Sequence, residues 1–243
     1  MTKLSVNVNK LATLRNSRGK NNPDVLKTTL DIITYGAQGI TVHPRPDGRH
    51  IRREDVYAIS KAINVEFNME GYPDHAFLEL VKAIKPTQCT LVPDPPHVLT
   101  SNAGWEIEKN KNFLYDIIHI LHQNGIRTSL FIDPMRISPK ELEALAGTKT
   151  DRIELYTEAY ADAFDTDKQS DVLNIYKDVA TEITQLGIGI NAGHDLDLEN
   201  LHHFVQSIPN VAEVSIGHAL ICDALQFGLQ DTMAKYLACL KNT

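Results

Sequence analysis

Residues 23–44 read PDVLKTTLDIITYGAQGITVHP, and this stretch holds one full repeat of the pattern that decides the fold. Its first part carries apolar residues at helical spacing and closes on glycine, which is the expected stop of a helix. Its last part alternates instead, with Ile40 and Val42 set between polar neighbours, as in a strand. The stretch therefore predicts a helix that leads into a strand, and the strand ends at His43.

The same pattern repeats along all 243 residues. Short β-branched runs predict eight strands, at residues 4–9, 39–44, 65–70, 89–93, 128–133, 152–157, 188–193 and 213–218. A segment that can be helical follows each strand, which favours parallel pairing because parallel neighbours need a crossover connection. Eight such units predict a closed (β/α)8 TIM barrel, with a doubly wound open sheet as the alternative. No linker divides the chain, so we expect a single barrel domain over residues 1–243.

Composition excludes several classes of partner. The net charge is -7 and the pI is about 5.8, which argues against nucleic acids and anionic membranes as partners. The N-terminal segment has no signal-peptide core, and no apolar run approaches the roughly 18 residues of a membrane helix. We therefore expect a cytoplasmic protein. The three cysteines lack CxxC spacing and support neither a disulfide framework nor a thiolate zinc site.

Polar and ionisable residues gather at the predicted strand ends, where a barrel places its chemistry. They are Asn7, Asn9, His43, Glu70, Asp133, Glu154, Thr157, Asn191, His194 and His218. Two long segments, residues 10–23 and 94–107, are predicted as irregular loops of the functional kind. The second contains Trp105, and we expect it to close over a substrate.

The last two strands end in NAGHD (191–195) and SIGHA (215–219), each with Gly-His before a helix. Glycine lets a backbone approach a phosphate, and helix N-terminal N–H groups face the anion, so these ends predict phosphate binding. Alternatively, Gly193 and Gly217 only turn the chain. Glu70 closes a buried strand, where burial raises its pKa toward the range of a general base. An ion-paired structural role, with Arg45 as the partner, is the alternative for Glu70.

Two absences shape the expected chemistry. The pairs His119/His122 and His202/His203 lie on predicted outer helices and HExxH is missing, which favours a metal-free acid/base site over a metal site. No predicted strand contains a lysine for a Schiff base, and Lys10 is the near candidate. If imine chemistry occurs, we expect a substrate to supply the amine.

Seven motifs in order along the chain resemble the pyridoxine 5'-phosphate synthase family. They are VNVNKLATLRNSRG (6–19), GITVHPRPDGRHI (39–51), FNMEG (67–71), SLFID (129–133), RIELYTEAYAD (152–162), NAGHDL (191–196) and SIGHAL (215–220). The resemblance implies a (β/α)8 barrel with extra helices, assembled as a homo-oligomer, an octamer. It implies the condensation of 3-amino-2-oxopropyl phosphate with 1-deoxy-D-xylulose 5-phosphate to pyridoxine 5'-phosphate, phosphate and water. It implies no metal and no organic cofactor.

The resemblance also implies roles for individual residues. His43 and Glu70 correspond to proton acceptors, His194 to the proton donor, and Glu154 to a carboxylate that stabilises the transition state. The positions that correspond to the site of the amino-ketone phosphate are Asn7, Arg18, Gly217 and His218. Those that correspond to the site of the deoxyxylulose phosphate are Arg45, His50 and Thr100. Arg49 is expected to be only a surface charge.

This chain departs from the family pattern at two places. Asn9-Lys10 stands where many members have Asp-His, and Lys10 can compensate by holding a hydroxyl or phosphate. Asp195 replaces the commoner glycine, and we expect its backbone N–H to serve the substrate while its side chain turns away, as a helix cap. Two other functions stay open: another phosphosugar isomerase or lyase, and a phosphate-ligand-binding barrel without catalysis. Retention of His43, Glu70 and His194 together argues against the second.

Overall fold

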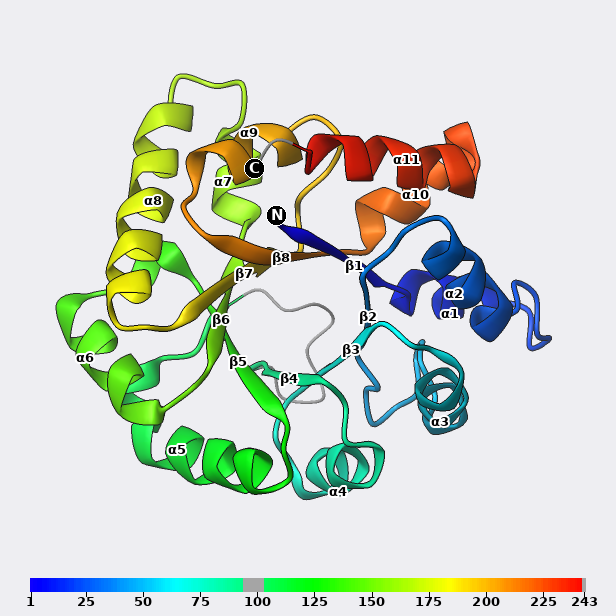
Figure 1. The fold of residues 1–243 in the computed structure, drawn as a ribbon, viewed down its shortest axis with the longest axis horizontal. Coiled ribbons are helices and arrows are strands. Elements are labelled where there is room, and N and C mark those ends of the chain that lie inside the picture. Colours follow the sequence, from blue (N-terminus) through cyan, green and yellow to red (C-terminus); the bar gives the residue numbers. More distant parts are fainter. Residues whose placement is uncertain (94–102, 242–243) are drawn as a thin grey trace.

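The computed structural model describes residues 1–93 and 103–241. Eight parallel strands close into a barrel in which each pairs with the next and the last pairs with the first (Figure 1). They are β1 (Lys3–Asn7), β2 (Gly39–Val42), β3 (Glu66–Gly71), β4 (Gln88–Leu91), β5 (Arg127–Ile132), β6 (Arg152–Tyr156), β7 (Gly189–Gly193) and β8 (Val211–Ile216). The predicted barrel is confirmed, each strand to within two residues, and closure of the sheet rules out the open alternative.

Helices surround the barrel in the described part of the chain (Figure 1). The helix that follows each strand in turn is α2 (Val25–Thr34), α3 (Arg53–Ala62), α4 (His75–Ile84), α5 (Ile107–Gln123), α6 (Pro139–Thr148), α8 (Gln169–Gln185), α9 (Leu201–Ser207) and α10 (His218–Phe227). The additional helices are α1 (Asn9–Asn16), α7 (Glu158–Ala163), α11 (Leu229–Cys239) and the short 3-10 helix η1 (Pro134–Arg136). Over the described ranges, no helix is both long and apolar enough to cross a bilayer.

Helix α1 corrects the expectation of an irregular loop over residues 10–23. Leu11, Ala12 and Arg15 are buried on one face of this helix, at a spacing that a helix brings together. Arg15 forms an ion pair with Asp55 of α3, in which Nη2 lies 2.9 Å from Oδ2, and also donates to the carbonyl of His50 (3.3 Å). The segment therefore fastens α1 to the loop after β2.

Trp105 is packed into the protein, whereas it was expected in a segment that closes over a substrate. It is buried, its Nε1 donates to the carbonyl of Leu91 (2.9 Å), and its ring stacks on Tyr72 with centroids 6.1 Å apart. These contacts fix the indole at the end of β4, so the expected closing role is wrong for Trp105. Residues 94–102 of the same expected loop, including Thr100, lie outside the described residues.

The interior of the barrel is polar and hydrogen bonded across its middle. Gln88 on β4 donates to Glu213 on β8 (3.3 Å) and accepts from Asn191 on β7 (3.2 Å). Because β4 pairs with neither β7 nor β8, these side chains meet through the inside of the barrel. Asn68 on β3 likewise donates to Thr41 on β2 (3.3 Å). The apolar alternate positions of the strands are buried against the helices instead.

The buried ion pair of α1 predicts a measurable loss of stability. Arg15→Met keeps the apolar stem but leaves Asp55 without its cationic partner, which costs about 3–5 kcal/mol when a buried pair is broken. Urea unfolding should show this loss as a lower midpoint. Lys27→Met, which removes the exposed pair with Asp31 on α2, is the matched control and should leave the midpoint in place. Equal midpoints for Arg15→Met and the wild type would contradict the prediction.

Candidate active site

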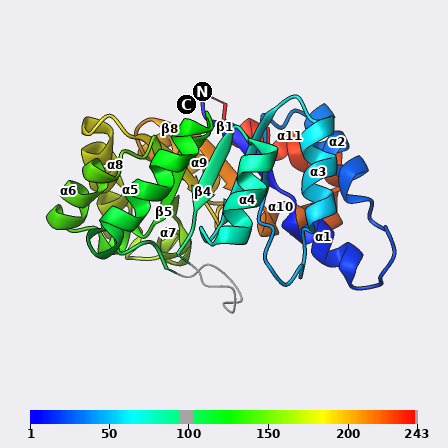
Figure 2. The ribbon, with the colours of Figure 1, turned by 90° about the horizontal axis from the view of Figure 1, so that it is seen from below.

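A cavity of about 860 Å³ opens at the carboxyl ends of the strands. In Figure 2 the chain enters β1 from the N-terminus at the top, so this mouth faces downward. Among the described residues the lining is Asn7, Asn9, Lys10, Thr13, His43, Arg45, Arg49, His50, Glu70, Val92, Phe131, Glu154, Ala161, His194, Asp195, Asp197, Ser215, Gly217, His218 and Ala219. Its volume lies within the range of small-molecule binding sites.

The structure brings together every predicted site residue except two. Arg18 is exposed beyond the end of α1 and does not line the cavity, and Thr100 lies outside the described residues. Sequence reasoning missed Arg49 as a lining residue, as well as Ser215 and Asp197. Only the closeness of Arg49 to Arg45 and His50 in the sequence gave a signal for it.

Two histidines on the β2 side of the mouth are held in the neutral form. Burial, reinforced by Arg45, lowers the pKa of His43 well below its usual value. Burial, followed by the charges of Arg45 and Lys10, lowers the pKa of His50 to about 4. The Nδ1 atom of His50 accepts a hydrogen bond from the backbone N–H of Ile51 (2.9 Å), which requires an unprotonated nitrogen there. Both rings are therefore neutral near pH 7, and each keeps one unprotonated nitrogen.

The loop that carries Arg45 and Arg49 is hydrogen bonded to α1 on the side away from the cavity. Asn16 Nδ2 donates to the carbonyls of Gly48 (3.3 Å) and His50 (2.9 Å), beside the bond from Arg15. Arg49 forms an ion pair with Asp47, with Nη2 and Oδ2 2.6 Å apart, while it lines the cavity. Arg49 is therefore only partly exposed and faces the mouth, which corrects the expectation that it is only a surface charge.

Asparagines at the end of β1 and at the start of α1 bond to two of the predicted proton acceptors. Asn9 Oδ1 accepts from the backbone N–H of His43 (2.9 Å), and Asn7 Nδ2 donates to Glu70 Oε2 (3.3 Å). Lys10 lines the mouth, whereas Lys3 lies in β1 at the far end of the barrel and pairs with Glu66. Lys3 corrects the expectation that no strand contains a lysine, but it does not reach the mouth.

Burial raises the pKa values of two carboxyl groups at the base of the cavity. Burial raises the pKa of Glu70 to about 7; the positive charges of His194 and Arg45 oppose this rise, and Glu213 adds to it. Burial, together with the charges of Glu70 and Glu213, raises the pKa of Glu154 well above its usual value. Burial therefore favours the protonated form of Glu154, and Glu70 can exchange a proton near neutral pH.

Gly193 and Gly217 are required by close packing. A Cβ on Gly193 would lie 2.7 Å from Glu154 Oε1 and 2.7 Å from the carbonyl oxygen of Ser215. A Cβ on Gly217 would lie 3.0 Å from the Cβ of Asn7. Gly217 also caps α10, whose first N–H groups have no partner within the helix and open toward the cavity through His218.

The arrangement of Asp195 differs from the expected one. Its backbone N–H donates to Thr157 Oγ1 (3.1 Å), and its Oδ2 lies 2.6 Å from Nδ1 of His194. Asn200 is the N-cap of α9. The side chain of Asp195 therefore binds the neighbouring histidine and caps no helix, because the imidazole offers a closer donor.

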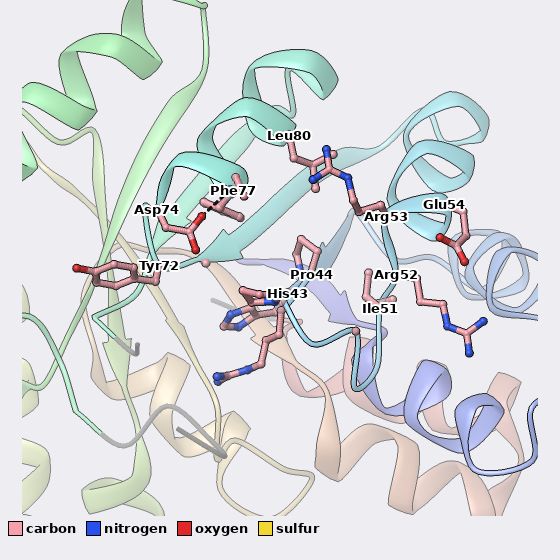
Figure 3. A pocket seen from close by; sticks show the side chains of 15 residues that line it. His43, Pro44, Ile51, Arg52, Arg53, Glu54, Tyr72, Asp74, Phe77 and Leu80 are labelled. Carbon is pink, nitrogen blue, oxygen red and sulfur yellow. Dashed lines mark hydrogen bonds between the residues drawn. The ribbon is translucent and has the colours of Figure 1, made fainter. Parts of the chain in front are cut away.

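A smaller cavity of about 320 Å³ adjoins the mouth behind His43 (Figure 3). It lies between the end of β2, the start of α3 and the start of α4, and Tyr72 and Phe77 form its apolar side. His43 and Arg45 line both cavities, so they stand at the boundary between them. Within the described ranges, no group of three or more His, Cys, Asp or Glu residues is arranged to hold a metal ion.

Comparison with known proteins decides the family. The profile of the family described as "Pyridoxal phosphate biosynthesis protein PdxJ" matches residues 4–242. The chain belongs to the PdxJ family. A pyridoxine 5'-phosphate synthase of Porphyromonas gingivalis is 55% identical over 236 residues, which cover 97% of this chain and 98% of that protein. One of Cytophaga hutchinsonii is 52% identical over 241 residues, which cover 99% and 100%. The resemblance inferred from the seven motifs is confirmed, and the chain is an enzyme of the PdxJ family.

Solved structures of other barrels support the fold of this PdxJ member. A 3-keto-L-gulonate-6-phosphate decarboxylase from Vibrio cholerae superposes with a TM-score of 0.65 at 10% identity, covering 98% of this chain and 96% of that one. Phosphoribosyl anthranilate isomerase from Thermotoga maritima superposes with a TM-score of 0.63 at 12% identity, covering all of both chains. At such low identity the likeness concerns the fold alone.

The raised pKa of Glu70 predicts how stability depends on pH. Between its ordinary pKa of 4.5 and about 7, the folded protein retains a proton that the unfolded chain has released. The free energy of unfolding must then fall as pH rises through this window, by about 1.4 kcal/mol for each unit of the pKa increase. Glu70→Gln should lack this part of the fall in urea titrations at pH 4.5, 6 and 7.5. Glu79→Gln, an exposed change on α4, should keep the wild-type slope, and the same slope for Glu70→Gln would contradict the prediction.

Proposed function

We propose that this protein is a pyridoxine 5'-phosphate synthase that condenses 3-amino-2-oxopropyl phosphate with 1-deoxy-D-xylulose 5-phosphate, with release of phosphate and water. The observation that carries the proposal is the joint placement of His43, Glu70 and His194 in one cavity with the cations of the β2 loop and the open N-terminus of α10. A protein that only binds phosphate needs the donors but not the three proton carriers. A cytoplasmic location, a homo-octameric assembly and independence from metal and organic cofactors belong to the same proposal.

The proton carriers suit a sequence of imine formation, dehydration, phosphate loss and ring closure. Neutral His43 accepts the first proton, and Glu70, with a pKa of about 7, accepts the second. His194 donates a proton to a leaving oxygen. Protonated Glu154 stabilises negative charge that develops beside it. Each positioned proton transfer contributes about 10²–10⁴-fold to the rate.

Two groups of donors suit the two phosphates. Arg45 and His50 hold the sugar phosphate on the β2 side, and Arg49 faces the same space. Gly217 and His218 hold the amino-ketone phosphate at the N-terminus of α10. The reacting amine is the substrate's own, since Lys10 stands among the anion-binding groups of the mouth. Holding both reactants in one cavity supplies effective concentration.

The direct test is to incubate the purified protein with both phosphorylated substrates. The pyridine chromophore and inorganic phosphate should appear together, in equal amounts beyond any phosphate released without enzyme. Glu70→Gln should reduce turnover by about 10²-fold or more, because the second acceptor is lost. The same variant should bind 1-deoxy-D-xylulose 5-phosphate nearly as well as the wild type in calorimetry. Folded wild-type protein that forms no product would overturn the proposed function.

Phosphate binding should raise the pKa of His50. A dianion beside the ring favours the charged imidazole, and it offsets the repulsion from Arg45 and Lys10 that now lowers the pKa to about 4. NMR titration of the histidine ring signals, with and without 1-deoxy-D-xylulose 5-phosphate, measures the change. The ring signals of His122, on the outer helix α5, are the internal control and should not change when the ligand is added. An unchanged or lower pKa for His50 would place the phosphate elsewhere.

A further inference from the structure

The turn after β7 holds His194 in an unusual backbone conformation. Its φ of 96° lies in the left-handed region, which residues other than glycine rarely adopt. The buried hydroxyl of Thr157 spans the turn, since it donates to the carbonyl of Gly193 (2.8 Å) and accepts from the N–H of Asp195 (3.1 Å). Such conformations persist where surrounding contacts determine them. The hydroxyl of a residue after β6 thus maintains the turn that presents the histidine.

The imidazole of His194 is fixed on two sides. Its Nδ1 lies 2.6 Å from Oδ2 of Asp195, within the range of a charge-assisted hydrogen bond. Its ring meets the ring of Tyr156 edge to face, with centroids 5.2 Å apart and planes at 82°. Among the described residues, no side chain or backbone group bonds to Nε2 of His194. Since His194 lines the cavity, Nε2 is the nitrogen left for a ligand.

We propose that Asp195 is a positioning residue which, through its bond to Nδ1, directs Nε2 of His194 into the cavity and keeps the imidazole charged as the proton donor. This inference rests on the proposed function, in which His194 is that donor. In the donating step the Nε2–H bond breaks, its electron pair stays on the nitrogen, and the proton goes to the leaving oxygen of the substrate. The neutral imidazole keeps its Nδ1–H bond to Asp195, and a solvent proton restores Nε2–H.

The groups around His194 agree with a charged donor. Burial alone would lower the pKa of His194, but the hydrogen bond and charge of Asp195 outweigh burial and raise it. Glu70 on β3 and Glu158 at the start of α7 act in the same direction. Tyr156 packs against the ring, and burial keeps its phenol in the protonated, neutral form at neutral pH by raising its pKa. Every anionic group that faces the ring therefore favours its protonation.

The pair also explains how a carboxylate is tolerated in a cavity that receives phosphates. An isolated Asp195 would repel an anion, as expected from its replacement of glycine. When the Asp195 carboxylate is bound to the charged imidazole of His194, the two side chains together carry no net charge. The repulsion between Asp195 and a phosphate in the cavity is then largely cancelled.

The test compares Asp195→Asn with the wild type. The amide keeps the shape of the side chain but loses its charge, so we expect the pKa of His194 to fall by about one unit or more in NMR titrations of the ligand-free protein. At a pH above both values, a fall of one unit leaves about 10-fold less charged imidazole. The alkaline limb of the kcat profile should therefore move to lower pH, with kcat at pH 8 reduced about 10-fold and KM within about two-fold. Asp195→Gly, which restores the commoner residue of the family, should shift the titration in the same direction.

Asp197→Asn is the matched control. Asp197 also lines the cavity, but its Oδ1 accepts from the backbone N–H groups of Glu199 (2.9 Å) and Asn200 (3.0 Å), bonds that an amide oxygen can retain. The titration of His194 should stay in place in this variant. An unmoved His194 titration in Asp195→Asn, or a kcat loss that is equal at every pH, would overturn the inference. If the wild-type protein formed no product from the two substrates, the proposed function would be overturned instead. The two failures can be told apart because the NMR titration measures the Asp195–His194 pair without any substrate.

Discussion

The hydrogen-bonded polar interior of the barrel is the constraint on which the site depends. Buried amides and carboxyls need partners, and in this protein they find them across the barrel, as Gln88 does with Asn191 and Glu213. These bonds require the strands to keep one register and the barrel to stay closed. They also extend polar character from the base of the barrel up to Glu70 and Glu154. The inward-facing strand positions therefore serve both the stability of the barrel and the candidate active site.

Burial then sets the protonation of the mouth in two opposite ways. It raises the pKa of carboxyl groups, as for Glu154, and it lowers the pKa of imidazoles, as for His43. His194 is the exception because a carboxylate binds it directly. Three protonation behaviours thus coexist within one cavity: neutral imidazoles, a carboxyl that titrates near neutrality, and an imidazole whose pKa is raised. Local contacts, more than residue type, separate their roles.

The sequence allowed the barrel to be predicted because short runs of strand-forming residues alternate with segments that can form a crossover helix. It also placed His43, Glu70 and His194 correctly, since strand ends converge in a parallel barrel. Helix α1 was not predicted because its first and last residues are asparagines and only a narrow face of it is apolar. The bridge from Thr157 to the 193–195 turn links neighbouring strands that lie 36 residues apart, so no local pattern reveals it. The bond between Asp195 and His194 likewise depends on a left-handed backbone that only the structure shows.

The attachment of α1 to the loop after β2 has a thermodynamic consequence. Arg15 and Asn16 hold the backbone of residues 48–50, so Lys10, Arg45 and Arg49 are gathered on one side of the mouth in the ligand-free fold. The cost of gathering these positive charges is met at folding, where Asp47 offsets part of it at Arg49, and an anion bound at the mouth would offset more. Binding then requires little ordering of the loop, which is the benefit of preorganisation. Anion affinity and the stability of the fold are therefore linked: the same contacts that assemble the cations make the folded state respond to the anion's concentration.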